Sequence, residues 1–356
     1  QYVYGSKVIK EDKDILAEAT SFRVYPNENI VKELQDEGYE VVDEFKLANL
    51  TSGENIIQFT LSIAEYTITY SGLEGITGWE GREGKTNPNP GKYTINDEFT
   101  LVNPEKTGYE FTGWELISGT VDEGVHNPTE VFIEEGSRGD LAFEATFKER
   151  NDLKYEVHYF YDGEENESQK VEEENATFGT EIPYEAPKTA TYNEQNYVLE
   201  RIEKPSNGVV TTTEENNVVN IYYTLDEDGP ENEPDGTPDK YQIRITYVAG
   251  ANGSVSGEKE EFHTVKTFDV ADDGTISNVQ DSPARPKAEV TAEADDGYEF
   301  SSWTSGENTY ADVEEIRALR LSQDTTFTAN FTERTDLGYE VHYFYDGEEN
   351  ESQKVE

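Results

Sequence analysis

The sequence predicts a mainly β chain with minor α content, organised as an array of small modules. Three observations predict this class. Short runs rich in β-branched and aromatic residues alternate between apolar and polar positions, which is the period of a half-buried strand. The chain is only 34% hydrophobic, but 23 Tyr, 16 Phe and 3 Trp supply large ring surfaces for thin cores. One stretch occurs twice without a difference, which is typical of repeat proteins.

The strand pattern is clearest in YEFTGWEL (109–116), LAFEATF (141–147) and YEVHYFY (155–161). The last of these runs into Asp162-Gly163, a dipeptide that favours a hairpin turn. Alternation then places Val157 and the three Tyr of this run on one face, and its Glu, His and Phe on the other.

One segment has a clear helix pattern, NENIVKELQDEGY (27–39). Asn27 or Asn29 can cap its N-terminus, and Gly38 stands where a residue with positive φ commonly ends a helix.

The repeats divide the chain into two module types that alternate. YEVHYFYDGEENESQKVE is found at 155–172 and again at 339–356, and GYEFTGW (108–114) corresponds to GYEFSSW (297–303). IIQFTLSI, near the end of the first segment, resembles VVNIYYTL at 218–225. The predicted segments are a divergent or partial type-two module with one helix (1–65), a type-one module (66–148), a type-two module (149–225), an acidic Pro/Gly linker (226–240), a divergent type-one module (241–334) and the start of a further type-two module (335–356). The last segment is a strand and a turn without the rest of its module, so we expect it to pack poorly in this chain alone.

Each type-one module carries aromatic residues at a spacing of two and then three. Such rings reach one core if a bulge or a strand end shifts the face of the Trp. We therefore expect a buried ring cluster rather than a sugar-stacking platform at these positions: Tyr109, Phe111, Trp114, Tyr298, Phe300 and Trp303. Trp79 differs because it lies among Gly and charged residues in GITGWEGREG (75–84). This setting predicts an exposed loop, in which Trp79 contacts a ligand or a neighbouring module.

The type-one pattern, with its Gly108, Tyr109, Phe111 and Trp114, resembles the Listeria–Bacteroides (internalin B-type) repeat of bacterial surface proteins. The second copy departs more, because its middle is longer and less regular. The type-two segment resembles the mucin-binding-protein (MucBP-like) repeat more loosely. Both resemblances imply compact β-grasp-like modules in secreted, often wall-attached, adhesins.

Charge and composition limit the partners and the location. With 28 Lys+Arg against 77 Asp+Glu, the net charge of −49 repels nucleic acid and anionic membranes, so we expect neither nucleic-acid binding nor membrane insertion. The absence of Cys excludes a disulfide framework and fits a bacterial surface. We expect an extracellular, cell-surface location, with cell-wall attachment through regions outside this sequence.

No sequence pattern for catalysis is found. H-E-x-x-H, G-x-S-x-G and phosphate-loop motifs do not occur, and the four His are not grouped, so we expect no enzyme and no cofactor. Calcium is the one metal for which the sequence offers a ligand set, because Gly and Pro turns could bring carboxylates of the linker together. Its ligands would be Asp226, Asp228, Asp235 and Asp239, and the alternative is a solvated linker without a metal.

These observations favour a non-enzymatic adhesin stalk or spacer whose partners are the neighbouring modules of the same chain. Two alternatives remain open. The type-two modules could bind host mucin, another glycan or a surface protein, with many weak copies giving avidity. The chain could also self-associate into an extracellular fibre through strand edges or module stacking.

Overall fold

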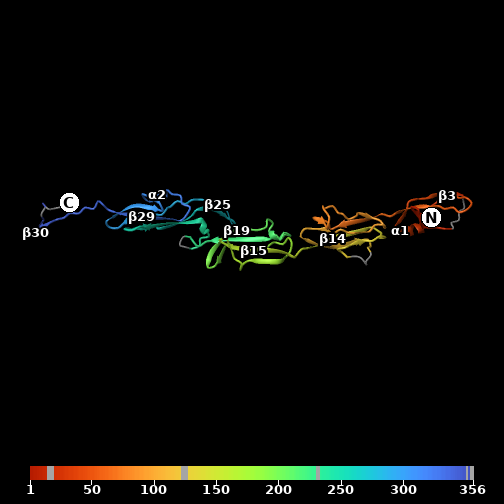
Figure 1. Cartoon of the computed structure of the whole chain (residues 1–356), viewed down its shortest axis with the longest axis horizontal. Coiled ribbons are helices and arrows are strands. Elements are labelled where there is room, and N and C mark those ends of the chain that lie inside the picture. Colours follow the sequence, from red (N-terminus) through yellow and green to blue (C-terminus); the bar gives the residue numbers. More distant parts are fainter. Residues whose placement is uncertain (14–19, 122–126, 230–232, 350–351, 353–356) are drawn as a thin grey trace. The chain divides into compact units, whose positions relative to one another are not determined.

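The computed structural model describes residues 1–356 except 14–19, 122–126, 230–232, 350–351 and 353–356. Strands dominate and helices are few (Figure 1), so the predicted mainly β fold with minor α content is confirmed. Contacts group the chain into two units. Unit 1 comprises residues 1–153, 175–180 and 210–212, and unit 2 comprises residues 154–174, 181–209 and 213–356.

Unit 1 begins with a module in which one helix packs against a four-stranded sheet of order β2-β1-β6-β4. Strand β1 is parallel to β6, and the other neighbours are antiparallel. Leu34 of the helix is fully buried in a cluster with Tyr2, Phe59 and Leu61 of the sheet. The elements are β1 (Tyr2–Tyr4), β2 (Lys7–Lys10), β3 (Ser21–Val24), α1 (Glu28–Asp36), β4 (Tyr39–Val41), β5 (Lys46–Asn49) and β6 (Phe59–Ile63), with β3 and β5 forming a separate antiparallel pair.

The caps of α1 follow the sequence pattern. Asn27 Oδ1 accepts a hydrogen bond from the Asn29 amide at 3.0 Å, so Asn27 is the N-cap and Asn29 lies in the first turn. Gly38 comes directly after the C-cap residue and has a φ of +87°. The predicted helix is therefore confirmed, and the structure decides between its two candidate caps.

The type-one module of unit 1 has a central sheet of order β12-β14-β7-β9, with β7 parallel to β14. The register of β12 shifts between Phe111 and Gly113, where Gly113 has a φ of +145°. This bulge brings the rings of Phe111 and Trp114 together, with centroids 5.7 Å apart. The elements are β7 (Tyr66–Ser71), β8 (Gly78–Trp79), β9 (Lys92–Tyr93), β10 (Phe99–Thr100), β11 (Pro104–Glu105), β12 (Tyr109–Ser118), β13 (Phe132–Ile133) and β14 (Leu141–Glu149).

Unit 2 contains a six-stranded sheet of order β16-β15-β20-β19-β18, in which β17 also pairs with β15. The order β16-β15-β20-β19 repeats the order β2-β1-β6-β4 of unit 1, and β15 is parallel to β20 as β1 is to β6. The likeness of IIQFTLSI to VVNIYYTL thus reflects equivalent strands, β6 and β20. The elements are β15 (Leu153–Tyr161), β16 (Glu164–Glu165), β17 (Val171–Ala176), β18 (Thr189–Tyr192), β19 (Gln195–Glu203), a 3-10 turn (Glu214–Asn216) and β20 (Val218–Leu225).

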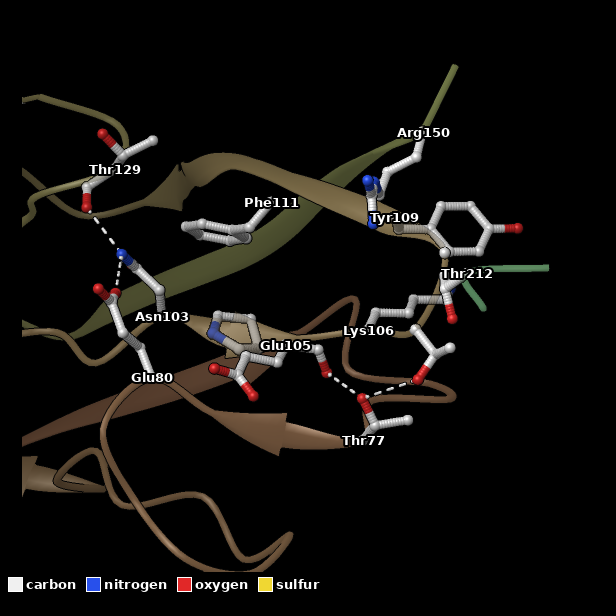
Figure 2. A pocket seen from close by; sticks show the side chains of 13 residues that line it. Thr77, Glu80, Asn103, Glu105, Lys106, Tyr109, Phe111, Thr129, Arg150 and Thr212 are labelled. Atoms are coloured by element: carbon white, nitrogen blue, oxygen red, sulfur yellow. Dashed lines mark hydrogen bonds between the residues drawn. The ribbon is translucent and has the colours of Figure 1, made fainter. Parts of the chain in front are cut away.

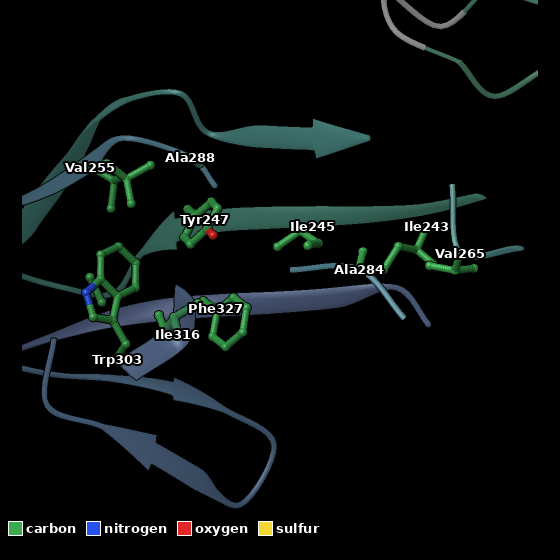
Figure 3. Close-up of a cluster of buried hydrophobic side chains, with 12 residues drawn as sticks. Ile243, Ile245, Tyr247, Val255, Val265, Ala284, Ala288, Trp303, Ile316 and Phe327 are labelled. Atoms are coloured by element: carbon green, nitrogen blue, oxygen red, sulfur yellow. The ribbon is translucent and has the colours of Figure 1, made fainter. Parts of the chain in front are cut away.

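The second type-one module, also in unit 2, has a sheet of order β23-β21-β29-β27-β28. Read in the other direction and without β28, the order β27-β29-β21-β23 repeats β12-β14-β7-β9 of the first type-one module. Strand β21 is parallel to β29. Tyr247, Trp303 and Phe327 lie at the centre of its core (Figure 3). The elements are a 3-10 turn (Asp239–Tyr241), β21 (Gln242–Ala249), β22 (Gly253–Gly257), β23 (Glu260–Thr264), β24 (Lys266–Val270), β25 (Ile276–Asp281), β26 (Val290–Ala294), β27 (Tyr298–Ser305), β28 (Asn308–Tyr310), α2 (Val313–Arg317) and β29 (Thr325–Glu333).

The two identical stretches have different surroundings. In the first copy, Val157 and Tyr161 of β15 are buried beneath paired strands, while Tyr155 and Tyr159 are half-buried. In the second copy, the described residues form only the hairpin of β30 (Phe344–Tyr345) and β31 (Glu348–Glu349), and their rings are exposed. The 18-residue stretch therefore does not bury its rings by itself. In the first copy, Tyr161 packs against rings of β18, β19 and β20, which lie outside the stretch.

Candidate functional site

A groove with a volume of about 610 Å³ lies on unit 1 (Figure 2). Its walls come from the chain around β8, from β11, from the start of β12 and from the residue that follows β14. The lining residues are Thr77, Glu80, Asn103, Pro104, Glu105, Lys106, Thr107, Gly108, Tyr109, Phe111, Thr129, Arg150 and Thr212.

One wall of this groove is polar and fixed by hydrogen bonds. Asn103 Nδ2 donates to Glu80 Oε2 at 3.0 Å and to the Thr129 carbonyl at 2.9 Å (Figure 2). Asn103 Oδ1 is buried and has no hydrogen-bond partner among the described residues. Thr107 Oγ1 donates to Thr77 Oγ1 at 3.4 Å. This wall therefore offers hydroxyl groups to the groove, beside an Asn103 side chain that is held in place by its own hydrogen bonds.

The other wall carries a cation and two aromatic rings. Lys106 Nζ lies 4.6 Å from the centroid of the Tyr109 ring, and it has no carboxylate at ion-pair distance among the described residues. Arg150 forms a two-pronged ion pair with Asp152, with Nε–Oδ1 and Nη2–Oδ2 distances of 2.9 Å each. The Lys106 ammonium group can attract an anionic group at short range, although the net charge of −49 and the groove residues Glu80 and Glu105 oppose this attraction.

The structure places the predicted ring residues at different depths. Trp114 is 0% exposed and Trp303 is 2% exposed, so both indole rings are inside their cores. Phe111 and Phe300 are partly buried and pack against the two clusters. Tyr109 and Tyr298 are half-buried and lie outside both clusters, at the start of β12 and β27.

The expectation of an exposed Trp79 was wrong. Trp79 is 1% exposed and stacks on Trp114 with ring centroids 6.5 Å apart. It belongs to the two-residue strand β8, which pairs with β11, and its Nε1 donates to the Lys85 carbonyl at 3.2 Å. The Gly-rich sequence around it forms the turns that enclose the ring, so Trp79 cannot contact a ligand without unfolding.

The four Asp residues proposed as calcium ligands lie close in unit 2, but they bind protein groups. Asp226 is 2% exposed and accepts hydrogen bonds from the amides of Asp235 (3.1 Å) and Gly236 (3.0 Å). Asp239 Oδ1 accepts from the amides of Glu227 and Asp228 at 2.9 Å each.

The remaining carboxylates of this set bind side chains. Asp228 pairs with Arg244 at 3.1 Å, and Asp235 accepts from Gln242 Nε2 at 2.6 Å. Burial raises the pKa of Asp226 and Asp239 above the usual range, although hydrogen bonds from backbone amides oppose the shift. Among the described residues, no group of three or more His, Cys, Asp or Glu is arranged to hold a metal ion. In the part of the linker that the structure describes, these acids hold turns in place.

Two histidines lie between carboxylates within β-hairpins of identical sequence. His158 Nε2 is 2.9 Å from Glu156 Oε2, and its Nδ1 contacts Glu165. His342 has the same arrangement with Glu349 and Glu340, and its hydrogen bonds to these two carboxylates raise its pKa. The arrangement holds in both copies, so it depends on the hairpin alone and not on the surrounding sheet.

A buried carboxylate that the sequence analysis missed lies in the second type-one module. Glu261 is 8% exposed and accepts hydrogen bonds from the Tyr247 hydroxyl (2.8 Å), His263 Nε2 (2.8 Å) and the Lys287 amide (2.6 Å). Strand alternation in KEEFHTV (259–265) could have found it, because Glu261 shares a strand face with buried Val265.

Two family models match parts of the chain. Residues 263–335 match the divergent InlB B-repeat domain, which supports an internalin B-type repeat in the second type-one module. Such repeats suggest a surface or extracellular protein with a repeat region of bacterial type. Nothing in these matches corresponds to the MucBP-like resemblance of the type-two modules. No curated protein matches the chain.

The second match corrects the expectation that the chain is not an enzyme. Residues 136–296 match the catalytic domain of immune inhibitor A peptidase M6, which points to peptidase activity. Members of this family are metalloproteases, so the match also makes a metal cofactor plausible. The matched range begins in one type-one module and ends inside the other.

The described residues of the matched range do not fit a metallopeptidase centre. Of its two histidines, His158 contacts Glu156 and Glu165 of its own hairpin, and His263 contacts Glu261 of its own strand. No group of three potential metal ligands is found among the residues that the structure describes. We therefore derive no catalytic step from this arrangement.

Within the described part of the chain, no helix is both long enough and apolar enough to span a membrane.

Proposed function

We propose that this chain is a stalk or spacer region of a bacterial surface protein, exposed outside the cell and attached to the cell wall through other parts of the protein. The observation that carries the proposal is the alternation of two sheet plans. One plan occurs as β2-β1-β6-β4 and β16-β15-β20-β19, and the other as β12-β14-β7-β9 and β27-β29-β21-β23. Arrays of this kind lengthen by duplication because each module needs contacts only with its neighbours. In this proposal the type-two modules are MucBP-like repeats.

Pulling a single molecule by its two ends tests this proposal. We expect several separate unfolding steps, each releasing one module at about 3.3–3.6 Å per residue. In each module with parallel terminal strands, such as β7 and β14, a pulling force shears the backbone hydrogen bonds between them. If the whole chain extended without resistance, or unfolded in a single step, the stalk proposal would be contradicted.

A second candidate function is glycan binding by the groove on unit 1. The Thr hydroxyls that line the groove have the chemistry that binds the hydroxyls of a sugar. The Lys106 ammonium favours a sugar that carries a carboxylate, such as a sialic acid of mucin. The type-one copy in unit 2 has Asp295 at the position of Lys106, so this specificity belongs to the first copy.

Binding of the full chain to sialylated mucin glycans tests this candidate. We expect Lys106→Glu to weaken binding at least about tenfold, which is about 1.4 kcal/mol. Lys85→Glu is the matched control, because it makes the same charge change at an exposed residue outside the groove. Equal binding by the two variants, or no binding by the unaltered chain, would rule out the groove.

A further inference from the structure

In unit 1, an aromatic side chain covers the start of β12. The ring of Phe178 lies 5.8 Å from that of Tyr109, edge to face at 65°. Gly108 has a φ of +81° and touches this ring so closely that an added Cβ would lie 2.3 Å from it. Only Gly therefore fits beneath Phe178, for reasons of both backbone conformation and space.

Backbone hydrogen bonds hold the same segment. The Phe178 amide donates to the Arg150 carbonyl at 2.8 Å, and the Arg150 amide donates to the Gly108 carbonyl at 3.0 Å. The ion pair of Arg150 with Asp152 fixes this stretch of chain after β14. We call Gly108, Tyr109 and Arg150 the socket, and Phe178 is its plug.

The second type-one module has the same socket without a plug. Gly297 has a φ of +88°, and a Cβ added there would meet no atom within 4 Å. The Arg334 amide donates to the Gly297 carbonyl at 2.9 Å, as in the first copy. Arg334 also pairs with Asp336, with Nε–Oδ1 and Nη2–Oδ2 distances of 2.9 and 2.8 Å. Among the described residues, none donates a hydrogen bond to the Arg334 carbonyl, the atom that corresponds to the acceptor for Phe178.

The apolar residues after this second socket are also uncovered. Leu337 is 58% exposed, whereas Leu153 at the same position of the first copy is 1% exposed. Tyr339 is 75% exposed, whereas Tyr155 is half-buried. Because residues 339–356 are identical in sequence to 155–172, the difference comes from missing partner strands and not from side-chain chemistry.

We propose that Gly297, Tyr298 and Arg334 form a docking socket for the Phe of a type-two module that is completed after residues 339–356. The occupant has the chemistry of residues 173–225: a Thr-Phe-Gly segment whose ring covers Tyr298 and whose amide binds the Arg334 carbonyl, and a strand like β20 that covers residues 339–345. The proposal goes beyond the stalk, because it assigns the residues of a type-one module that contact the following type-two module.

The test extends the full chain by a copy of its own residues 173–225 after Glu356 and measures amide hydrogen exchange. We expect exchange at 297–299 and 334–345 to slow by about tenfold or more relative to the unextended chain. Changing the added copy of Phe178 to Ala should abolish protection at 297–299 and 334–336, while residues 339–345 stay protected by their sheet. Phe178→Ala in the first copy is the matched control and should speed exchange at 108–109 and at 150.

A paired substitution gives an independent readout. In the unextended chain, Gly108→Ala should speed exchange around Phe178, whereas Gly297→Ala should have no effect beyond its own turn. In the extended chain, Gly297→Ala should speed amide exchange around the added copy of Phe178, as Gly108→Ala does around Phe178 itself. The proposal is overturned if residues 339–345 gain no protection on extension. It is also overturned if protection at 297–299 is absent, or is unchanged when the added Phe becomes Ala.

Discussion

Replacing Trp114 by Ala is expected to lower the free energy of unfolding of the first type-one module by about 3–5 kcal/mol. Trp114 is 0% exposed and its ring contacts those of Tyr70, Trp79, Phe111 and Phe143 at centroid distances of 5.5, 6.5, 5.7 and 6.4 Å. Among the described residues of this core, no other ring packs against as many rings. A loss of this size is a large part of the stability of a small domain, so the module should be largely unfolded under mild denaturing conditions.

Tryptophan fluorescence during urea unfolding measures this effect. The chain has three Trp, and only Trp303 lies outside the first type-one module. In a Trp303→Phe background the signal therefore comes from the first module, and Trp79 still reports on it when Trp114 is Ala. Ile117→Ala is the control, because Ile117 lies on the same strand but is 54% exposed, and it should change stability by less than about 0.5 kcal/mol. Equal effects of the two substitutions would mean that Trp114 does not anchor the core.

The sequence predicted this core because its signals are local. Period-two alternation located β12 and β14. The spacing of Phe111 and Trp114 indicated a bulge or a strand end, and the structure has a bulge at Gly113. These inferences need only residues that are neighbours along one strand. The repeat divided the chain into two module types, and the strand orders show two sheet plans that each occur twice.

Long-range pairing accounts for the prediction about Trp79 that failed. The strand that holds Trp79 is two residues long, and its partner β11 comes 25 positions later at Pro104. A run this short has no period to detect, so the surrounding Gly residues suggested a loop. The groove was missed for the same reason, since Asn103, Lys106 and Thr212 come together only when the chain folds.

Hydrogen bonds to backbone amides explain why the acidic linker differs from a freely solvated segment. Composition predicted that residues 226–240 cannot form a core. Their acidity suggested either a fully solvated linker or carboxylates that bind calcium. Instead, Asp226 and Asp239 accept hydrogen bonds from backbone amides of neighbouring turns. Asp and Asn commonly stabilise turns in this way, but which amide each accepts from depends on the fold.

Glu261→Leu is expected to destabilise the second type-one module by about 2–5 kcal/mol at pH 7, because buried donors would lose their acceptor. The Tyr247 hydroxyl and the Lys287 amide both donate to this carboxylate. Burial raises the pKa of Tyr247 well above its usual value, so the hydroxyl keeps its proton and cannot adapt by ionising. The first type-one module differs, since the equivalent Tyr70 donates to the Pro90 carbonyl at 2.9 Å and needs no acid.

The pH dependence of the unfolding free energy separates the contribution of the Glu261 charge from that of its size and shape. Burial alone would raise the pKa of Glu261, but hydrogen bonds from the Ala288 and Lys287 amides, His263 and Tyr247 outweigh it and lower the pKa below 4.5. The folded state therefore binds this proton less tightly than the unfolded state does. Its contribution to stability is fully present above pH 4.5 and is lost as the pH falls through the lowered pKa.

Glu261→Gln keeps the size and one acceptor oxygen but cannot be charged, so it isolates this contribution. The difference in unfolding free energy between the unaltered chain and Glu261→Gln should be constant from pH 7 to about pH 5 and shrink below it. The other carboxylates titrate alike in both proteins, so their contributions to the pH dependence of stability cancel in this difference. In a Trp79→Phe, Trp114→Phe background the fluorescence comes from Trp303 and reports on this module. Glu260→Gln on the exposed face of the same strand is the control. A difference that stayed constant down to pH 3 would mean that Glu261 stabilises the fold only as a neutral acceptor.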